Sequence, residues 1–480
     1  MQKIKNYING QLIAPVAGEY LDNYEAATGK VYSLIPQSNG ADLELAVSAA
    51  EAAQKNWAEM PAEERSNLLL KLAEAIDAAS DELARAEAID NGKPIAFARA
   101  VDSYRSAANI RFFANAATQF ASESHSMGAV GVNYTLREPI GIVGCISPWN
   151  LPLYLFTWKI APALATGNCV IAKPSEITPM TAYIFSKLCI EVGLPQGVLN
   201  ILHGTGPSIG GPMVEHPKIK AISFTGGSAT GKHIASVAAP LLKKTSLELG
   251  GKNPTLVFAD CDFDSTVSEV ARAAFSNQGQ ICLCGSRIYV ERPIYEKFKQ
   301  AFVDKIQKLQ IGDPLDETTQ HGALVSKSHM EKVLSYIQLA QDEGGKILCG
   351  GNKVSVAGRC EAGYFVAPTV IEGLPLNCRT NQEEIFGPVC TLQPFDTDEQ
   401  AIELANGTEY GLATSVWSNN IKRCHRLSRE LDFGIVWLNT WLLRDLRTPF
   451  GGVKSSGMGR EGGHEAMRFF TEPKNVCVKY

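Results

Sequence analysis

The chain has 480 residues and a net charge of −5, and it is 45% hydrophobic and 20% charged. These values are typical of a soluble globular protein, and the length predicts two or three domains because single cores rarely grow so large. No basic arm is present, so a nucleic-acid-binding protein is not expected. The polar N-terminus, Met1–Ile13, does not resemble a signal peptide. The apolar runs are broken well before the roughly 20 residues that a membrane span needs.

Twelve cysteines are scattered along the chain. An even count does not establish a disulfide framework in so long a chain, and we expect free thiols in a reducing, cytoplasmic compartment. Cys282 and Cys284 form a C-x-C pair. No partner pair follows at the spacing of zinc ligands, so no metal site is expected.

The first 125 residues are predicted to be mainly helical. Apolar residues at three- and four-residue spacing predict a helix over Leu68–Leu83. A second helix is predicted over Ile95–Phe120, after a break marked by Gly92 and Pro94.

From Arg137 onward, short β-rich runs alternate with helical segments. This alternation predicts βαβ units and a parallel sheet, and continuous apolar runs are typical of parallel strands that are buried on both faces. Strands are expected over Gly141–Pro148, Cys169–Pro174, Val198–Gly204, Ala221–Gly227 and Ser246–Gly251.

A second α/β pattern begins at Asn253, so we place a domain boundary near Gly251. In this part a helix is predicted over Phe263–Gln278. Further strands are expected over Thr255–Asp260, Ser286–Glu291 and Ile435–Thr440.

Cys282 and Glu248 are candidates for catalysis. A Gly-Gln turn brings Cys282 to the end of the predicted helix, although a single buried cysteine usually only packs. Glu248 lies in an apolar strand before Gly250 and Gly251. Apolar surroundings raise the pKa of a carboxylate, which suits a general base. The alternative is an edge-strand glutamate that faces solvent.

Polar residues also follow the ends of two predicted parallel strands, where ligands of open α/β sheets bind. The amide of Asn150 could donate a hydrogen bond to an oxyanion, although asparagine in such a place is more often an N-cap. Lys173 and Glu176 could bind the hydroxyls of a nucleotide ribose.

The segment Gly226–His233 fits a P-loop as far as Gly231 and Lys232. His233 stands where a P-loop requires Ser or Thr, so an ATPase is not expected. A glycine-rich turn that opens a helix could still bind a pyrophosphate.

Together, these segments resemble the aldehyde dehydrogenase superfamily over nearly the whole chain. The resemblance implies an α/β fold with a parallel-sheet NAD-binding domain, an α/β catalytic domain and a β oligomerisation arm. The matching motifs occur in the family's order: Pro148–Asn150, Lys173–Glu176, Phe224–Gly226, the segment around Glu248, the GQxC that ends at Cys282, Glu384–Pro388 and Pro449–Glu461.

The resemblance also implies domain limits. The NAD-binding domain would comprise residues 1–125 and 138–250, the catalytic domain 251–450, and the arm 126–137 and 466–480. Val130–Arg137 would pair with Val476–Tyr480, a strand that extends a sheet across subunits and so covers an exposed edge. A homo-oligomer, a dimer or a tetramer, is therefore expected, with a small-molecule aldehyde as substrate.

The family's mechanism is implied for three residues. Cys282 would attack the aldehyde as a thiolate, and Asn150 would hold the oxyanion together with the backbone N–H of Cys282. Hydride transfer to the nicotinamide would leave a thioester, and Glu248 would activate the water that releases the acid.

Further matches concern the cofactor. Lys173 and Glu176 would bind the adenosine ribose, and a carboxylate there favours NAD over NADP. Gly227 departs from the family, since many members have Ser there, and Ser228 or backbone would replace the lost hydroxyl. The other matching cofactor positions are Ile146, Trp149, Ser175, Phe224, Gly226, Thr230, Leu249, Glu384 and Phe386.

Within the family, Trp149–Lys159 and Asn439–Gly452 resemble the semialdehyde dehydrogenases of aromatic-ring and tryptophan breakdown. Those enzymes oxidise 2-aminomuconate or 2-hydroxymuconate 6-semialdehyde, which carries a carboxylate at the end remote from the aldehyde. The planar fork of an arginine matches that group. The matching substrate positions are Arg105, Arg444 and Trp158.

Several alternatives remain open. Arg105 would otherwise lie on a solvated helix face, and Arg444 would form an ion pair with Asp445. If the match of these two segments to the family is displaced, Arg111 and Arg447 are the candidates for binding the carboxylate instead. The substrate would otherwise be betaine aldehyde or a simple aliphatic aldehyde. Betaine aldehyde is a cation, however, and two arginines would repel it. A non-catalytic protein on the same fold is disfavoured by the intact catalytic residues. The sequence does not distinguish the amino from the hydroxy substrate.

Overall fold

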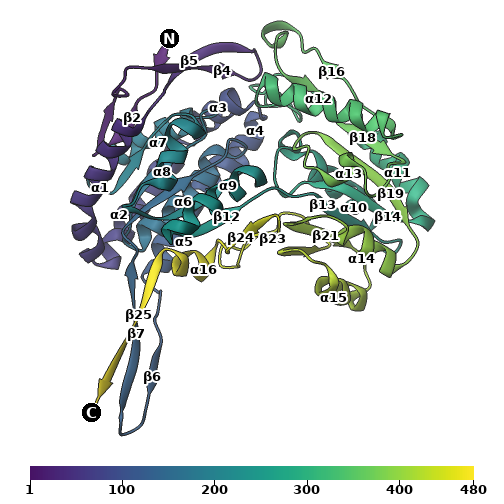
Figure 1. Cartoon of the computed structure of the whole chain (residues 1–480). Coiled ribbons are helices and arrows are strands. Elements are labelled where there is room, and N and C mark those ends of the chain that lie inside the picture. Colours follow the sequence, from purple (N-terminus) through teal and green to yellow (C-terminus); the bar gives the residue numbers. More distant parts are fainter.

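The computed structural model describes all 480 residues, Met1–Tyr480. Two α/β lobes lie side by side, and a narrow arm of strands projects from the first of them (Figure 1). The first lobe, purple to teal, contains the N-terminal half of the chain, and much of the rest forms the green lobe. The predicted fold class is confirmed: an α/β architecture with two main sheets and a β arm.

An eight-stranded sheet forms the centre of the first lobe. Its five middle strands are parallel and stand in the order β12-β11-β8-β9-β10, which confirms the predicted parallel sheet. Antiparallel strands extend both edges. The strands are β2 (Asn6–Ile8), β3 (Gln11–Ile13), β8 (Ile142–Ile146), β9 (Cys169–Lys173), β10 (Leu199–Ile201), β11 (Ile219–Thr225), β12 (Lys244–Glu248) and β24 (Gly457–Met458).

This strand order creates a switch point between β8 and β11. From β8 the chain continues to β9 and β10 on one side, and it then returns to form β11 and β12 on the other side. Loops that leave the carboxyl ends of β8 and β11 therefore diverge, and a crevice opens between them.

The helices of the first lobe pack against this sheet and against one another. Helix α6 is buried along its whole length, with α5 packed against it. The helices are α1 (Gly40–Glu59), α2 (Ala62–Ala78), α3 (Ser80–Asn91), α4 (Ile95–Phe97), α5 (Tyr104–Ala117), α6 (Pro152–Ala165), α7 (Met180–Glu191), α8 (Gly211–Glu215) and α9 (Ser228–Ala238).

Two expectations for the N-terminal region were wrong. The helix predicted over Leu68–Leu83 is two helices, because α2 ends and α3 begins at Ala79 while the apolar spacing continues across the kink. Short strands precede the helices, among them β1 (Gln2–Lys3), β4 (Tyr20–Glu25) and β5 (Lys30–Pro36). These strands pair with one another or with the main sheet, and such distant pairing leaves no local pattern.

The second lobe contains a seven-stranded sheet in the order β15-β18-β19-β14-β13-β21-β22, parallel except for β15. Its strands are β13 (Asn253–Val257), β14 (Gly285–Glu291), β15 (Lys346–Cys349), β18 (Thr369–Glu372), β19 (Val389–Phe395), β21 (Ala413–Trp417) and β22 (Ile435–Leu438). Its main helices are α10 (Phe263–Phe275), α11 (Arg292–Ile306), α12 (Lys327–Asp342), α14 (Asp398–Asn406) and α15 (Ile421–Glu430).

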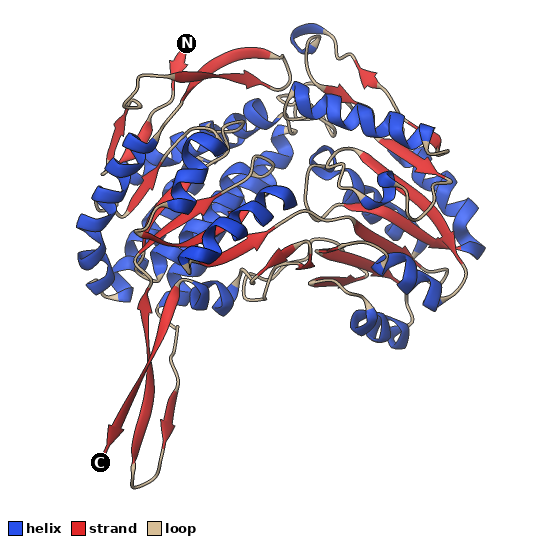
Figure 2. Ribbon diagram, viewed as in Figure 1, coloured by secondary structure: helices blue, strands red, loops and turns tan.

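The arm is a three-stranded antiparallel sheet that stands away from both lobes (Figure 2). It is built from β6 (Ser124–Ser126), β7 (Gly131–Pro139) and β25 (Thr471–Lys479). Strand β25 pairs with β7 along its full length. The C-terminal strand is thus longer than the Val476–Tyr480 segment that we expected.

The predicted domain limits stay a prediction. Strand β12 belongs to the first sheet and β13 to the second, and Gly251 lies in the short segment between them. Strand β24, however, returns from the second half of the chain to the edge of the first sheet. No helix of the structure is long and apolar enough to cross a bilayer.

Candidate active site

A cavity of about 250 Å³ lies at the switch point between β8 and β11. Residues of both lobes line it, so it lies between the two sheets. The lining residues are Pro148, Trp149, Asn150, Thr225, Gly226, Gly227, Leu249, Gly250, Cys282, His329, Lys332, Glu384 and Phe386. The position agrees with the rule that open α/β sheets bind ligands beyond the carboxyl ends of their strands.

Asn150 is held in this cavity by its side chain and its backbone. Its Nδ2 donates to the carbonyl of Gln280 at 3.0 Å, and its own carbonyl accepts from Nδ2 of Asn277 at 2.9 Å. Asn91, at the end of α3, donates to the carbonyl of Trp149 at 2.9 Å. Asn150 is not an N-cap, because Leu151 occupies that position of α6. The second N–H of its amide remains free to donate to a ligand.

The loop that carries Cys282 differs from the prediction. Helix α10 ends at Phe275, and Asn277, Gln278 and Gly279 follow with φ values of 50°, 55° and 69°. Left-handed backbone is costly for residues other than glycine. A Cβ at Gly279 would also collide with the carbonyl of Gly387. A buried left-handed turn, rather than a helix end, therefore presents Cys282 to the cavity.

The two cysteines of this loop lie in different surroundings. Cys282 is half-buried and lines the cavity, whereas Cys284 is buried, with its Sγ 3.8 Å from the carbonyl of Ser276. Burial raises the pKa of the Cys282 thiol, and the charge of Glu248 raises it further. The thiol therefore needs a proton acceptor to become a thiolate, which is the nucleophilic form of cysteine.

Glu248 ends strand β12 with only 4% of its surface exposed. The edge-strand alternative is wrong, because β11 and β24 flank β12 on its two sides. Neither carboxylate oxygen has a hydrogen-bond partner in the chain. Burial raises the pKa of Glu248 well above 4.5, and the nearby carboxylate of Glu461 adds to that rise.

The glycine-rich turn before α9 forms one wall of the cavity. Gly227 is the N-cap of α9, and a Cβ built there would meet nothing within 4 Å. Ser228, at the first position of the helix, turns its Oγ to the carbonyl of Ser455 at 3.4 Å. Backbone N–H groups at this helix start are thus left to bind an anion.

On the opposite wall, Glu384 and Phe386 lie close to the first lobe. Oε1 of Glu384 accepts a hydrogen bond from the N–H of Gly251 at 2.9 Å. Phe386 has a φ of 61°, and its ring meets that of Trp149 edge-on at 5.2 Å between centroids.

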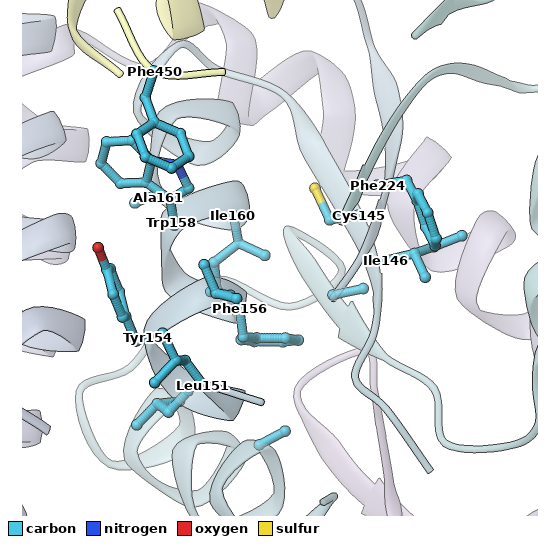
Figure 3. Close-up of a cluster of buried hydrophobic side chains, with 14 of the residues drawn as sticks. Cys145, Ile146, Leu151, Tyr154, Phe156, Trp158, Ile160, Ala161, Phe224 and Phe450 are labelled. Carbon is cyan, nitrogen blue, oxygen red and sulfur yellow. The ribbon is translucent and has the colours of Figure 1, made fainter. Parts of the chain in front are cut away.

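The remaining positions assigned to the cofactor are more scattered. Lys173 Nζ lies 3.0 Å from Glu176, and Glu176 lines a neighbouring cavity of about 560 Å³. Ile146 and Phe224 are buried partners on adjacent strands, as Figure 3 shows. Two others lie near helix starts, Ser175 buried before α7 and Thr230 exposed in the first turn of α9.

Arg444 is enclosed by aromatic rings. Its guanidinium carbon lies 4.1 Å from the ring centroid of Trp158 and 4.0 Å from that of Phe450. Nη1 donates to the hydroxyl of Tyr154 at 2.6 Å. Its Nε and Nη2 are buried without a hydrogen-bond partner. The suggested ion pair with Asp445 is absent.

The two alternative arginines are engaged elsewhere. Arg447 pairs with Asp445 at 2.6 Å, and Arg111 pairs with Asp77 at 2.5 Å, both at the surface. Arg105 is half-buried in the first turn of α5 and has no ion-pair partner in the chain. It stands one turn before Asn109, whose Nδ2 donates to the carbonyl of Tyr154 at 3.0 Å.

Comparison with known proteins decides the family. A model of the aldehyde dehydrogenase family matches residues 13–476 of the chain. The chain belongs to the aldehyde dehydrogenase family. It is thus an oxidoreductase that acts on an aldehyde, as the resemblance predicted.

Individual members of the family are similar over their whole length. A 2-aminomuconic semialdehyde dehydrogenase of Mus musculus is 48% identical over 99% of this chain and 98% of its own. A 2-hydroxymuconic semialdehyde dehydrogenase of Pseudomonas sp. (strain CF600) is 44% identical over 100% of both chains. The NAD+ complex of an aldehyde dehydrogenase from Bacillus cereus has a TM-score of 0.97 at 39% identity, covering 100% of this chain and 97% of its own.

Sequence reasoning missed two residues of this aldehyde dehydrogenase's cavity, His329 and Lys332, both on α12. The imidazole Nε2 of His329 lies 2.7 Å from the carbonyl of Phe386, and burial lowers its pKa to about 4. Lys332 donates to the carbonyl of Glu384 at 3.2 Å. No local motif marks them, because only the packing of α12 across the two lobes brings them to the site.

Proposed function

We propose that the chain oxidises an aldehyde whose far end carries a carboxylate, a 2-aminomuconic or 2-hydroxymuconic 6-semialdehyde, to the corresponding dicarboxylic acid. The observation that carries this proposal is Arg444. Its charge lowers the pKa of both Glu248 and Cys282, so it lies near both, and two of its nitrogens have no partner in the chain. The names of the most similar relatives support the same substrate class.

NAD is the cofactor that fits the residues present. The open backbone around Gly227 leaves room for a pyrophosphate at the start of α9. Glu176 supplies the carboxylate that favours a free ribose hydroxyl over a 2′-phosphate. When bound, NAD accepts the hydride that leaves the substrate carbon.

Cys282 is the proposed nucleophile, and Asn150 the proposed oxyanion donor. Attack by the thiolate on the aldehyde carbon places negative charge on the aldehyde oxygen. The Nδ2 group of Asn150 and the backbone N–H of Cys282 stabilise that charge, and one such donor lowers the barrier by roughly 3–4 kcal/mol. The hydrogen bonds from Asn277 and to Gln280 hold Asn150 in place before the substrate arrives.

Glu248 is the proposed general base. Its raised pKa leaves the carboxylate basic enough to take a proton from water near neutral pH. The resulting hydroxide attacks the thioester carbon and frees the acid and the Cys282 thiolate.

Arg105 and Arg444 are the proposed anchors of the remote carboxylate. Anchoring one end of a long conjugated chain decides which end reaches Cys282. Betaine aldehyde, the alternative substrate, is a cation, and the guanidinium of Arg444 would repel it. A neutral aliphatic aldehyde would leave the two buried nitrogens of Arg444 without a partner, which is costly.

The test compares a carboxylated semialdehyde with a neutral aldehyde of similar length in arginine variants. Arg444→Ala and Arg105→Ala are each expected to lower kcat/KM for the carboxylated substrate by about ten- to a hundredfold, because charge-assisted hydrogen bonds are lost. The neutral aldehyde is expected to change little. Arg447→Ala and Arg111→Ala are matched controls, since both arginines lie in surface ion pairs. Equal losses on both substrates would refute the carboxylate role.

The nucleophile is tested separately with the two cysteines of one loop. Cys282→Ala is expected to abolish aldehyde-dependent NADH formation while NAD still binds. Cys284→Ala is expected to keep most of the activity, because its thiol is buried away from the cavity. The opposite result would show that the nucleophile is wrongly assigned.

A homo-oligomer, at least a dimer, is part of the proposal, because the arm presents unpaired strand edges. The domain limits and the cytoplasmic location stay predictions.

A further inference from the structure

Tyr154 contacts Arg444 and the helix that carries Arg105, the two arginines to which the proposed function assigns the remote carboxylate. It belongs to the first turn of α6, and its side chain is 7% exposed. Its carbonyl accepts a hydrogen bond from Asn109 of α5, one turn after Arg105. Its hydroxyl accepts a hydrogen bond from Nη1 of Arg444. Figure 3 shows this hydroxyl end turned toward the rings of Trp158 and Phe450, which enclose Arg444.

The hydrogen bond from Arg444 leaves the proton of the Tyr154 hydroxyl unused. A phenol both accepts and donates, and here its oxygen accepts from Nη1 while no acceptor of the chain takes its proton. Arg444 cannot accept a hydrogen bond, since a guanidinium has donors only. The O–H of Tyr154 is therefore available to a ligand.

Other donors on Arg444 and on the ring beside it also lack acceptors. Nε and Nη2 of Arg444 are buried without a partner, and so is Nε1 of the neighbouring Trp158. Buried donors normally find acceptors, and leaving them unpaired costs stability. A group of donors without acceptors is complementary to a ligand rich in acceptor oxygens.

A carboxylate supplies those oxygens in a suitable geometry. Nε and Nη2 form one edge of the planar guanidinium, which matches the two oxygens of a carboxylate. The rings of Trp158 and Phe450 lie at cation–π distance from its central carbon, and a ligand would bind in its plane through the N–H groups. A carboxylate has about four lone pairs, so it can accept from the fork and from a hydroxyl at once.

We propose that Tyr154 is a specificity-determining residue that donates its hydroxyl proton to the remote carboxylate of the substrate. Arg444 orients the phenol through Nη1, and the phenol in turn fixes the rotation of the guanidinium. Because Nε and Nη2 are covered in this structure, binding displaces the residues around them. Arg444 lies in a loop whose next residues on either side, Leu443 and Asp445, are exposed, so side-chain packing does not hold these two neighbours in place.

The experiment removes one oxygen atom with Tyr154→Phe. For a carboxylated semialdehyde, kcat/KM is expected to fall about ten- to a hundredfold, mainly through KM, because a hydrogen bond to a charged group is lost. For a neutral aldehyde of similar length, both kcat and KM are expected to stay within about twofold of the wild type. Tyr183→Phe is the matched control, a buried tyrosine of the same lobe whose hydroxyl makes no hydrogen bond in the chain, and it is expected to change neither substrate.

Two outcomes would overturn the proposal. An equal loss on both substrates would mean that Tyr154 supports the fold of the site, and no loss on either would mean that its hydroxyl does not contact the carboxylate. Failure of the proposed function itself gives a different result, since Arg444→Ala would then lower kcat/KM equally for both substrates. If Tyr154→Phe folds poorly, inhibition of the wild type tests the donor cluster of Tyr154 and Arg444 as a whole. A muconate dicarboxylate should then inhibit competitively at least about tenfold better than its dimethyl ester, and equal inhibition would refute the donor cluster.

Discussion

Glu248 and Cys282 show how burial sets the protonation of single residues in this site. Both groups have pKa values raised by burial, the charge of Glu248 raises the pKa of Cys282 further, and the charge of Glu461 raises that of Glu248. The positive charges of Lys159, Arg444 and Arg460 oppose the rise for Glu248, and Arg444 also opposes it for Cys282, while Lys159 lies 2.7 Å from Glu461. The carboxylate and the thiol therefore both hold their protons more tightly than in water, and the proposed mechanism requires them to lose protons in turn.

Glu248→Gln is expected to separate hydride transfer from hydrolysis. The first turnover should proceed while the thioester accumulates, because the amide cannot take a proton from water. In the wild type, steady-state activity should fall as the pH falls through the raised pKa of Glu248. A burst of NADH followed by a slow phase, measured by stopped flow, checks this prediction. A loss of the burst itself would contradict it.

The same substitution has an effect on stability with a defined sign. The folded chain binds the Glu248 proton more tightly than the unfolded chain, so the stability contribution of this group is full below its unfolded pKa and is lost as the pH rises through its folded pKa. The free energy of unfolding of Glu248→Gln, relative to wild type, should therefore increase from pH 5 to pH 9. Chemical denaturation at several pH values measures it, and a constant difference would contradict the assignment.

At the scale of elements, a buried charge cluster ties three helical segments together. Lys93 Nζ lies 2.9 Å from Asp102, in the π-helical turn Ala98–Ser103, and 3.5 Å from Glu87 of α3. Glu87 in turn accepts a hydrogen bond from the N–H of Leu153 in the first turn of α6. The π turn changes the rotation of the helix that follows it, so it sets the direction in which Arg105 points.

Removing the lysine from this cluster should be strongly destabilising. Burial raises the pKa of Asp102 to about 7 even beside Lys93, so two carboxylates depend on one cation. Lys93→Met is expected to cost about 3–5 kcal/mol in the free energy of unfolding, because it leaves buried carboxylates unpaired. Arg99→Met, in the same π turn, removes two exposed ion pairs and should change stability little. Denaturant titration measures the free energy of unfolding of both variants. An equally small change in the two would show that the buried cluster does not stabilise the fold.

At the scale of the whole molecule, the arm has strand edges with which no other strand of the same chain pairs. Strand β25 pairs with β7 on one side only, and apolar residues of the arm are exposed. Among them are Val130, at 61% exposure, and Tyr480, at 72%. An open strand edge with exposed apolar side chains favours pairing with another chain, which agrees with the proposed homo-oligomer.

Disrupting this edge should change the assembly and leave each protomer folded. Val478→Asp is expected to lower the mass measured by light scattering at micromolar concentration, because it places a charge on the outer strand of the arm. Val16→Asp, at an exposed valine far from the arm in sequence, is the control and should not change the mass. A wild-type protein that is already monomeric would contradict the proposed role of the arm.

Much of the fold could be predicted from short stretches of sequence. The parallel strands β8, β9 and β10 lie within the predicted segments, because buried parallel strands are continuous apolar runs. Strands β11 and β12 overlap their predicted segments but begin two residues earlier. The errors occur where distant contacts override the local pattern. The helix predicted to reach Gln278 stops at Phe275, since hydrogen bonds from Asn277 and Gln278 to other segments stabilise a left-handed turn.

The sequence by itself determined the family and the residues proposed for catalysis, because Asn150, Glu248 and Cys282 lie in contiguous motifs that the chain carries in order. Only the tertiary structure decided which arginine is left without an ion pair and which residues surround it. Arg447 and Arg444 stand three residues apart, yet one lies in a surface ion pair and the other between two aromatic rings. The hydrogen bond from Arg444 to Tyr154 joins residues 290 positions apart. Such a contact depends on how α6 and the C-terminal loop pack against each other, and no local pattern of residues encodes it.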